Sequence, residues 1–208
     1  MNVPAPPTIA GATSSSSSAN AQVADSENWM RLSLANNLHG TESMKEVLEN
    51  DFKVTINGRD FHLWISNARK KRNCKMQNFV WENLLGACTG GCPSGCNAQT
   101  DLSGLDVTSL HGIFSNLEHI IPSSVLSQHD IRTMKLKYKV HFESIKVARN
   151  YSAHYSLKSS MPNNDFQREW NRIRNALVAM KYTKIKMFDD LEQGSVCLLY
   201  TSPSPRDS

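Results

Sequence analysis

The sequence predicts an all-α protein whose helices are joined by loops of modest length. Apolar residues recur every three or four positions in several segments, which is the spacing of one face of a helix. Polar capping residues precede these segments, and glycine or proline follows several of them. The single strand-like pattern has no other strand beside it, so it would be marginal by itself. A length of 208 residues fits one domain with appended segments.

Both ends of the chain are expected to lie outside the fold. Residues 1–25 are rich in Pro, Ala, Thr and Ser, and such a segment buries too little apolar surface to offset its chain entropy, so we expect a disordered tail. Residues 197–207 match the translation of a transposase adapter used in sequencing libraries, residue for residue. We therefore expect residues 197–208 to be an artefact, and residues 184–196 to be the start of a truncated continuation.

Two helices and one turn are expected in the first third of the chain. Asp25 and Glu27 place acidic residues at the start of a helix, which Gly40 is expected to end before Thr41 opens the next helix. Asn57-Gly58 fits a hairpin turn between residues 52–56 and 61–64. Residues 60–85 as a whole carry a helical pattern.

Three further helices are expected after a loop at residues 86–104, which is rich in Gly, Cys, Thr and Ser. They cover residues 105–117, about 130–151 and 166–180. The third has the clearest apolar stripe, with Pro162 breaking the chain before it and residues 163–165 supplying its cap. These stripes indicate a helical core.

The stretch Ala148–Ser156 carries the candidate chemistry. Arg149 can fork onto phosphate oxygens and His154 can move a proton near neutral pH, which are the functions that metal-independent RNA cleavage needs. Asn150 lies four residues before His154 and shares its helix face. In an unbroken helix Arg149 and His154 lie about 140° apart, so they converge only if the helix ends between them or the Arg side chain curls around. The alternative is a surface Arg and a capping His near a helix C-terminus.

The surroundings of this stretch resemble the HEPN superfamily. Arg149, Asn150, Ala153 and His154 are followed, after a short loop, by Asp165, Phe166, Trp170, Ile173, Ala176 and Leu177. Residues 31–48 are similar to the opening helices of a HEPN branch found in the DAZ-interacting zinc-finger ubiquitin ligase and its invertebrate relatives, and residues 106–117 to its middle helix. The resemblance spans roughly residues 29–182 in order, and a Lys-rich stretch before Arg149 lengthens this chain relative to the family.

The resemblance implies a bundle of four to five helices over residues 26–183, often a homodimer with the Arg and His at a cleft between protomers. In catalytic members of the family this motif makes a metal-independent endoribonuclease without a cofactor. Carried over, Arg149 stabilises phosphate charge, His154 acts as general acid or base, and Asn150 orients the pair or bonds the substrate. We expect Arg149 and His154 to lie near each other, partly exposed, in a groove beside the helix at 166–180.

Basic residues form two further candidate sites for an anionic partner. Arg69, Lys70, Lys71 and Arg72 are consecutive, on a predicted helix. They could contact RNA phosphates or signal nuclear import, although a solvated helix face is the simpler interpretation. Lys146 and three other lysines (Lys135, Lys137 and Lys139) precede Arg149. If both clusters face one groove, they form a track for RNA.

Cys88, Cys92 and Cys96 suggest a metal site in the Gly-rich loop, with Cys74, His111 or His119 as further ligands. Structural zinc usually takes a second Cys pair, which the sequence lacks, so we favour free thiols and predict no metal.

Two functions stay open at this point. The first is a HEPN domain that binds RNA and cleaves it; the second is a non-catalytic helical dimerisation or interaction module of a larger signalling or ubiquitin-ligase protein, whose missing C-terminal domains would bind other proteins. The formal net charge of +4 permits an anionic partner without requiring one. No apolar run is long enough to span a membrane, and no basic start marks a signal peptide, so we expect a cytoplasmic protein, with the nucleus as the alternative.

Overall fold

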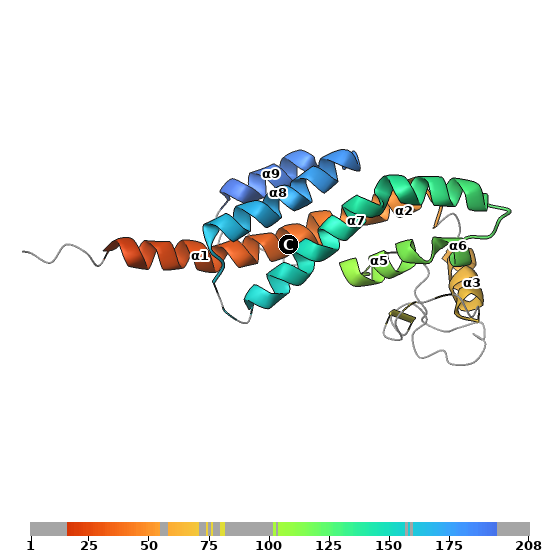
Figure 1. The fold of residues 1–208 in the computed structure, drawn as a ribbon, viewed down its shortest axis with the longest axis horizontal. Helices are drawn as coiled ribbons and strands as arrows, with labels where there is room; N and C mark the ends of the chain where they lie inside the picture. Colours follow the sequence, from red (N-terminus) through yellow and green to blue (C-terminus); the bar gives the residue numbers. More distant parts are fainter. Residues whose placement is uncertain are drawn as a thin grey trace, which may run out of the picture.

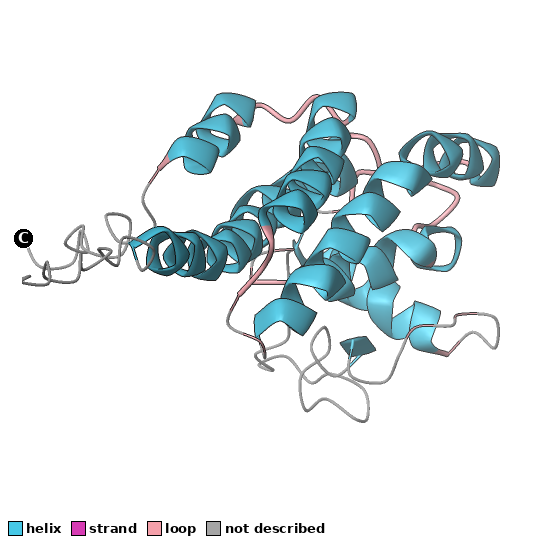
Figure 2. Cartoon of the chain, turned by 60° about the vertical axis from the view of Figure 1, so that its left-hand side comes forward, coloured by secondary structure: helices cyan, strands magenta, loops and turns pink. Residues whose placement is uncertain are grey.

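The computed structural model describes residues 16–54, 58–70, 74, 76, 80–81, 102, 104–156, 158 and 160–194. All regular structure among them is helical, which confirms the predicted all-α class (Figures 1 and 2). The elements are α1 (Ser16–Ala35), the π-helix η1 (Asn36–Gly40), α2 (Thr41–Asn50), α3 (Gly58–Arg69), α5 (Val107–Ser115), α6 (Leu117–Ile120), α7 (Gln128–Ser156), α8 (Asn163–Ala179) and α9 (Ile185–Gln193).

The long helix α7 organises the fold. It packs against α8 and α1 over its C-terminal part and against α5 and α6 on another side (Figure 1). Its buried side chains are Ile131, Tyr138, Phe142, Ile145, Ala148 and Ser152. Phe142 stacks on Phe114 of α5, with ring centroids 4.0 Å apart, so aromatic packing fixes how α5 lies on α7.

The N-terminal helices run on without the predicted stop at Gly40. Gly40 has helical dihedrals, and η1 leads directly from α1 into α2. The glycine permits close approach instead of termination, because a Cβ at this position would lie 2.6 Å from Asn36 Oδ1 and 3.0 Å from Ile145 Cγ2. Asn36 uses its side-chain amide to donate a hydrogen bond of 3.2 Å to the Ile145 carbonyl of α7. The helix α1 also begins at Ser16, within the segment predicted as tail.

The prediction of a hairpin around Asn57-Gly58 is wrong for residues 61–64, which were expected to form its second strand. Gly58 begins α3, and residues 61–64 are helical. The buried Trp64, Ile65 and Ala68 explain this outcome, because a helix gathers them on one face whereas an isolated hairpin could not bury them. Residues 55–57 lie outside the described part of the chain.

The helical domain extends beyond the predicted boundary at residue 183. Phe188 of α9 is fully buried and stacks on Trp170 of α8, with ring centroids 4.4 Å apart. Arg174 of α8 also donates two hydrogen bonds to the Asp189 carboxylate, at 2.7 and 2.9 Å. The segment predicted as a truncated continuation therefore supplies part of the core. Residues 195–208, including the predicted adapter, lie outside the described residues.

Two expectations about helix ends, one for α8 and one for residues 105–117, need small corrections. The predicted cap at residues 163–165 gives α8 no side-chain cap hydrogen bond, and Asp165 instead accepts a hydrogen bond of 2.6 Å from the Tyr155 hydroxyl of α7. The single helix expected at 105–117 is divided into α5 and α6 at Asn116.

Within the described residues, no helix combines the length and apolar character that crossing a membrane requires.

Candidate nucleic-acid interface

Five basic residues follow one side of α7: Arg132, Lys135, Lys139, Lys146 and Arg149. Their spacing of three, four, seven and three residues keeps them within about 100° of one another around the helix axis. At a rise of about 1.5 Å per residue, this basic row is about 25 Å long. It lies beside the buried face of α7, on the side that approaches α5 and α6.

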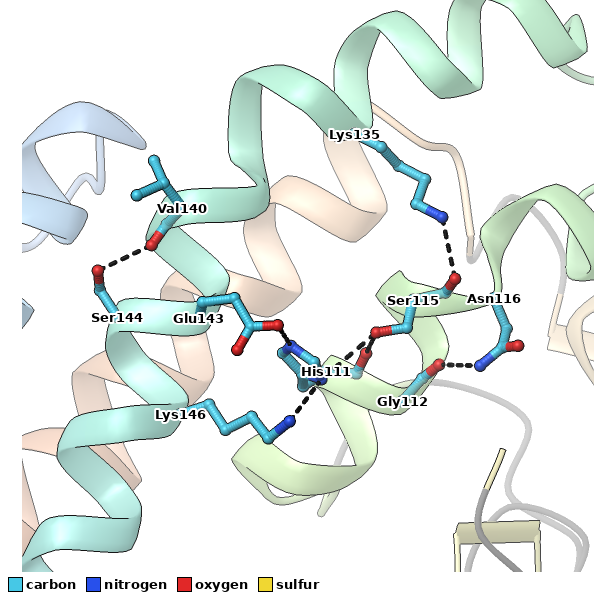
Figure 3. A network of polar contacts seen from close by, with 9 residues as sticks. All are labelled: His111, Gly112, Ser115, Asn116, Lys135, Val140, Glu143, Ser144 and Lys146. Atoms are coloured by element: carbon cyan, nitrogen blue, oxygen red, sulfur yellow. Dashed lines mark hydrogen bonds and ion pairs between the residues drawn. The ribbon is translucent and has the colours of Figure 1, made fainter. Parts of the chain in front are cut away.

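Contacts across to α5 and α6 confirm the direction of the basic row (Figure 3). Lys135 donates a hydrogen bond of 2.9 Å to the Ser115 carbonyl. Its ammonium also lies 3.3 Å from the Glu118 carboxylate. Arg149 lies 3.9 Å from Asp106, the residue that caps α5. The row therefore borders a crevice between α7 and the α5–α6 segment, which we call the basic crevice.

Two hollows lie along the basic crevice. The larger, of about 480 Å³, is lined by His111, Phe114, Ser115, Glu118, Arg132, Lys135, Leu136, Lys139 and Glu143. The smaller, of about 200 Å³, is lined by Met76, Val80, Thr108, His111, Gly112, Ser115, Asn116 and Lys146. His111 and Ser115 line both, so the two hollows adjoin at these residues.

The balance of charge in the basic crevice favours an anion. Among the described residues, the five bases of the row are opposed by three carboxylates, from Asp106, Glu118 and Glu143, so the described part of the crevice has a net positive charge. Lys139 is exposed and has no ion-pair partner among the described residues. The Arg132 side chain is 72% exposed and reaches Glu118 only at 3.9 Å. These two side chains are thus available to a ligand that enters from solvent.

His111 is the most perturbed group in the basic crevice. Its Nε2 lies 2.8 Å from Glu143 Oε1, and its Nδ1 lies 3.5 Å from the Lys146 ammonium (Figure 3). An ammonium can only donate, so Nδ1 is the acceptor and the ring proton is assigned to Nε2, which donates to Glu143. Burial lowers the pKa of His111, and the hydrogen bond to Glu143 partly opposes this shift. The imidazole is therefore neutral near pH 7.

The predicted catalytic residues occupy one unbroken helix. Because α7 continues to Ser156, Arg149 and His154 stay about 140° apart around its axis. Arg149 donates a hydrogen bond of 3.3 Å to Asn150 Oδ1 and faces Asp106, whereas the exposed His154 lies on the outer side of α7, as Asn150 does. The helix therefore does not bring Arg149 and His154 together within one chain.

Tyrosines occupy the place beside α8 where Arg149 was expected. The Tyr155 hydroxyl bonds to Asp165, and the Arg168 guanidinium of α8 lies 4.9 Å from the centre of the Tyr151 ring. A side chain at position 149 points about 160° away from Tyr151 on a helix, so it cannot share this contact.

The second predicted basic cluster is only partly described. Arg69 and Lys70 are exposed at the end of α3, a helix that packs against α6, while Lys71 and Arg72 lie outside the described residues. Lys146, by contrast, lies in the basic crevice.

The predicted thiol loop, with Cys88, Cys92 and Cys96, also lies outside the described residues. Cys74 Sγ lies 3.5 Å from Asn116 Oδ1, and His111 is engaged by Glu143. Among the described residues no group of three metal-ligating side chains comes together.

Sequence reasoning missed the pairing of His111 with Glu143. The two residues are 32 positions apart and on different helices, so no local motif could reveal their contact. The sequence signal nearest to this site is the group of lysines before Arg149, which predicts positive charge but does not indicate His111 or Glu143.

Comparison with known proteins gives no assignment: no family model, no curated protein and no solved structure matches the chain. The HEPN resemblance therefore stays a prediction. What the structure defines is an all-α domain with a basic crevice beside α7.

Proposed function

We propose that this domain binds RNA, and that the basic crevice is its binding surface. The observation that carries the proposal is the basic row, in which five cationic side chains share one side of a single helix. Lys and Arg bind phosphate oxygens, and a row about 25 Å long can follow several successive phosphates of one strand. The hydroxyls and the imidazole along the crevice supply further hydrogen-bonding groups.

Neutralising the two most available bases tests this proposal. Arg132→Gln with Lys139→Gln is expected to weaken binding of a single-stranded RNA at least several-fold, measured by fluorescence anisotropy at low salt, because each phosphate contact adds to affinity. The matched control is Lys181→Gln with Lys186→Gln, which removes the same charge from two exposed lysines outside the crevice. Equal weakening by both pairs would mean that net charge alone governs binding, which would contradict a defined surface.

Cleavage of the bound RNA is the finer part of the proposal and is supported by the HEPN resemblance. In that chemistry Arg149 stabilises phosphate charge, His154 transfers a proton, and Asn150 orients them. Arg149 also ends the basic row, where a bound phosphate would reach it. Since α7 holds Arg149 and His154 apart in one chain, a common site needs the Arg side chain to curl around α7 or a second chain to contribute.

The test of cleavage is separate from the test of binding. Activity is expected to survive EDTA, to leave 2′,3′-cyclic phosphate ends and to disappear in His154→Ala, whose side chain is exposed and contributes little to stability. RNA that binds and stays intact would reject cleavage and leave the binding function standing.

A second candidate function is pairing of two copies through the outer side of α7. Leu136, Val140 and Val147 are 77%, 62% and 40% exposed, and they lie within about 40° of one another around the helix axis. Asn150 and His154 extend this stripe, and Glu143 and Leu136 lie where it borders the basic crevice. Positions 136, 140, 143, 147, 150 and 154 alternate by four and three, the spacing of a helix-pairing seam. An antiparallel pair centred between His141 and Phe142 sets Leu136 of each copy opposite Val147 of the other.

Light scattering after size-exclusion chromatography tests this pairing. The chain is expected to be dimeric and Val140→Asp monomeric, because a buried unpaired carboxylate opposes association. Val178→Asp, at a position of α8 that is 53% exposed, is the matched control and should leave the dimer intact. A wild-type monomer at every concentration would reject pairing without affecting the RNA proposal.

A further inference from the structure

The two nitrogens of His111 face different chemical surroundings. Nε2 is directed at Glu143, which lines the larger hollow. Nδ1 is directed at Lys146 and lies 3.4 Å from Ser115 Oγ, and both of these residues line the smaller hollow. One side of the ring is therefore bound to a carboxylate, and the other opens on a site with a cation and a hydroxyl (Figure 3).

The smaller hollow has the composition of an anion site. Its polar groups include the Lys146 ammonium and the hydroxyls of Thr108 and Ser115, and none of the described residues that line it carries a carboxylate. Its volume of about 200 Å³ leaves room for a phosphate group. The larger hollow contains Glu118 and Glu143 and lacks this character.

The lone pair on Nδ1 is weakly engaged. Ser115 Oγ donates its proton to the His111 carbonyl at 2.8 Å, so it has none left for Nδ1. Among the described residues the remaining donor is Lys146, at 3.5 Å, which is long for a hydrogen bond. Nδ1 can therefore accept a proton without breaking a strong contact, and Glu143 at Nε2 would stabilise the resulting imidazolium.

We infer that His111 and Lys146 form a phosphate subsite in the smaller hollow, and that a phosphate group binding there is accompanied by uptake of one proton on His111 Nδ1. The protonated Nδ1–H and the Lys146 ammonium then both donate to phosphate oxygens, while Nε2–H keeps its bond to Glu143. This inference rests on the proposed RNA binding for the source of the phosphate, but the subsite itself takes any phosphate monoester or diester.

The sign of the pH dependence follows from the charged groups that face His111. Glu143 raises its pKa, while burial and Lys146 lower it, so that the pKa in the free protein lies below the ordinary value of about 6.5. A bound phosphate adds negative charge beside the imidazole and therefore raises the pKa of His111. For a phosphodiester, which does not titrate in this range, binding is therefore strongest below the pKa of His111 in the free protein, and it weakens by up to about tenfold per pH unit between the two values.

Nitrogen NMR of the His side chains in the full chain tests the subsite, with inorganic phosphate as the probe and chloride at equal ionic strength as the reference. Phosphate is expected to raise the pKa of His111, and Lys146→Met should abolish the shift while Lys146→Arg restores it. Lys186→Met, at an exposed position of α9, is the matched control and should leave the shift unchanged. His141, on a different side of α7, serves as the internal reference in every titration.

Three results would overturn the inference. They are an unchanged His111 titration in phosphate, a shift that persists in Lys146→Met, and an equal shift of His141, which would indicate a general ionic effect. A parallel titration with single-stranded RNA separates this inference from the proposed function. RNA that binds without shifting His111 would leave RNA binding intact and assign the subsite to free phosphate compounds. A shift with phosphate in a chain that binds no RNA would uphold the subsite and reject the RNA proposal.

Discussion

Gly40 shows how one residue sets the distance between helices. Alanine at this position is favoured by helix propensity by up to about 1 kcal/mol, but its Cβ would lie 2.6 Å from Asn36 Oδ1 and 3.0 Å from Ile145 Cγ2. Asn36 is fully buried and can move only by giving up its bond to Ile145. We expect the steric cost of the Cβ to exceed the gain in helix propensity. Gly40→Ala should therefore lower the free energy of unfolding by about 1–2 kcal/mol in denaturant titrations.

Gly194→Ala is the control for Gly40→Ala. A Cβ at Gly194 would have its closest contact at 3.4 Å, an ordinary van der Waals distance. Its unfolding free energy should change by less than about 0.5 kcal/mol. A Gly40→Ala protein as stable as wild type would mean that η1 and α7 do not need this close approach.

The buried His39 is expected to make the stability of the protein depend on pH. It is buried, its Nδ1 lies 3.0 Å from the Tyr182 hydroxyl, and burial lowers its pKa below the unfolded value of about 6.5, although Glu42 opposes the shift. A depressed His pKa means that the unfolded state binds more protons, so stability is fully present above pH 6.5 and falls as the pH drops through and below that value. His39→Gln should flatten this dependence between pH 7 and 5 in thermal unfolding. The remaining slope comes from His111 and His141, whose pKa values are also lowered. A variant with the wild-type slope would contradict the assignment to His39.

At the scale of elements, Asp106 links the stability of α5 to the charge of the basic crevice. Its side chain accepts a hydrogen bond of 2.8 Å from the Ser109 backbone N–H, and the same carboxylate lies 3.9 Å from Arg149. Asp106→Asn keeps a good N-cap and removes the charge, so we expect stronger RNA binding and a loss of only about 0.3–0.5 kcal/mol of stability from the weaker interaction with the helix dipole. Asp106→Ala should cost about 1 kcal/mol of stability through the lost cap. Unchanged RNA binding by Asp106→Asn would show that Arg149 does not contribute to the surface, and weaker binding would contradict the charge argument itself.

Helices with a regular apolar stripe could be predicted from the sequence. The stripe at Phe166, Trp170, Ile173 and Leu177 predicts α8 correctly apart from its start, which lies three residues earlier, because all four side chains are buried on one face. The prediction of a hairpin failed because the local preference of Asn57-Gly58 for a turn contributes less free energy than the burial of Trp64 and Ile65 in a helix. The prediction that Gly40 ends a helix was wrong for the same reason, because its tertiary contact with α7 outweighs its local tendency to end a helix.

The basic crevice could be predicted only in part. The lysines before Arg149 were recognised as positive charge, but their common side depends on the unbroken course of α7. The partners Asp106, His111 and Glu118 belong to α5, its cap and α6, the elements that precede α7, and each lies more than ten residues from the base that it contacts. Such pairings arise from the tertiary fold, and periodicity within one segment does not contain them.

At the scale of the whole molecule, α9 is part of the folded domain. Phe188 is fully buried against Trp170 and lies 5.8 Å from the His39 ring, whereas the adjacent Met187 is 59% exposed. Phe188→Ala is expected to cost about 3–5 kcal/mol in the free energy of unfolding, because it leaves a cavity between α8 and α9. Met187→Ala is the matched control and should be nearly neutral. Similar effects of the two substitutions would mean that α9 does not close the core.

The salt dependence of RNA affinity tests the central claim most directly. If the basic row holds successive phosphates, the logarithm of the affinity for single-stranded RNA falls linearly with the logarithm of the salt concentration, with a slope of about −3.5 for five contacts. Replacing Arg132 and Lys139 by Gln should reduce that slope by about 1.4, while replacing Lys181 and Lys186 should leave it unchanged. Affinity that does not depend on salt, or a slope that the crevice substitutions leave unaltered, would contradict the assignment of the basic crevice as the RNA-binding surface.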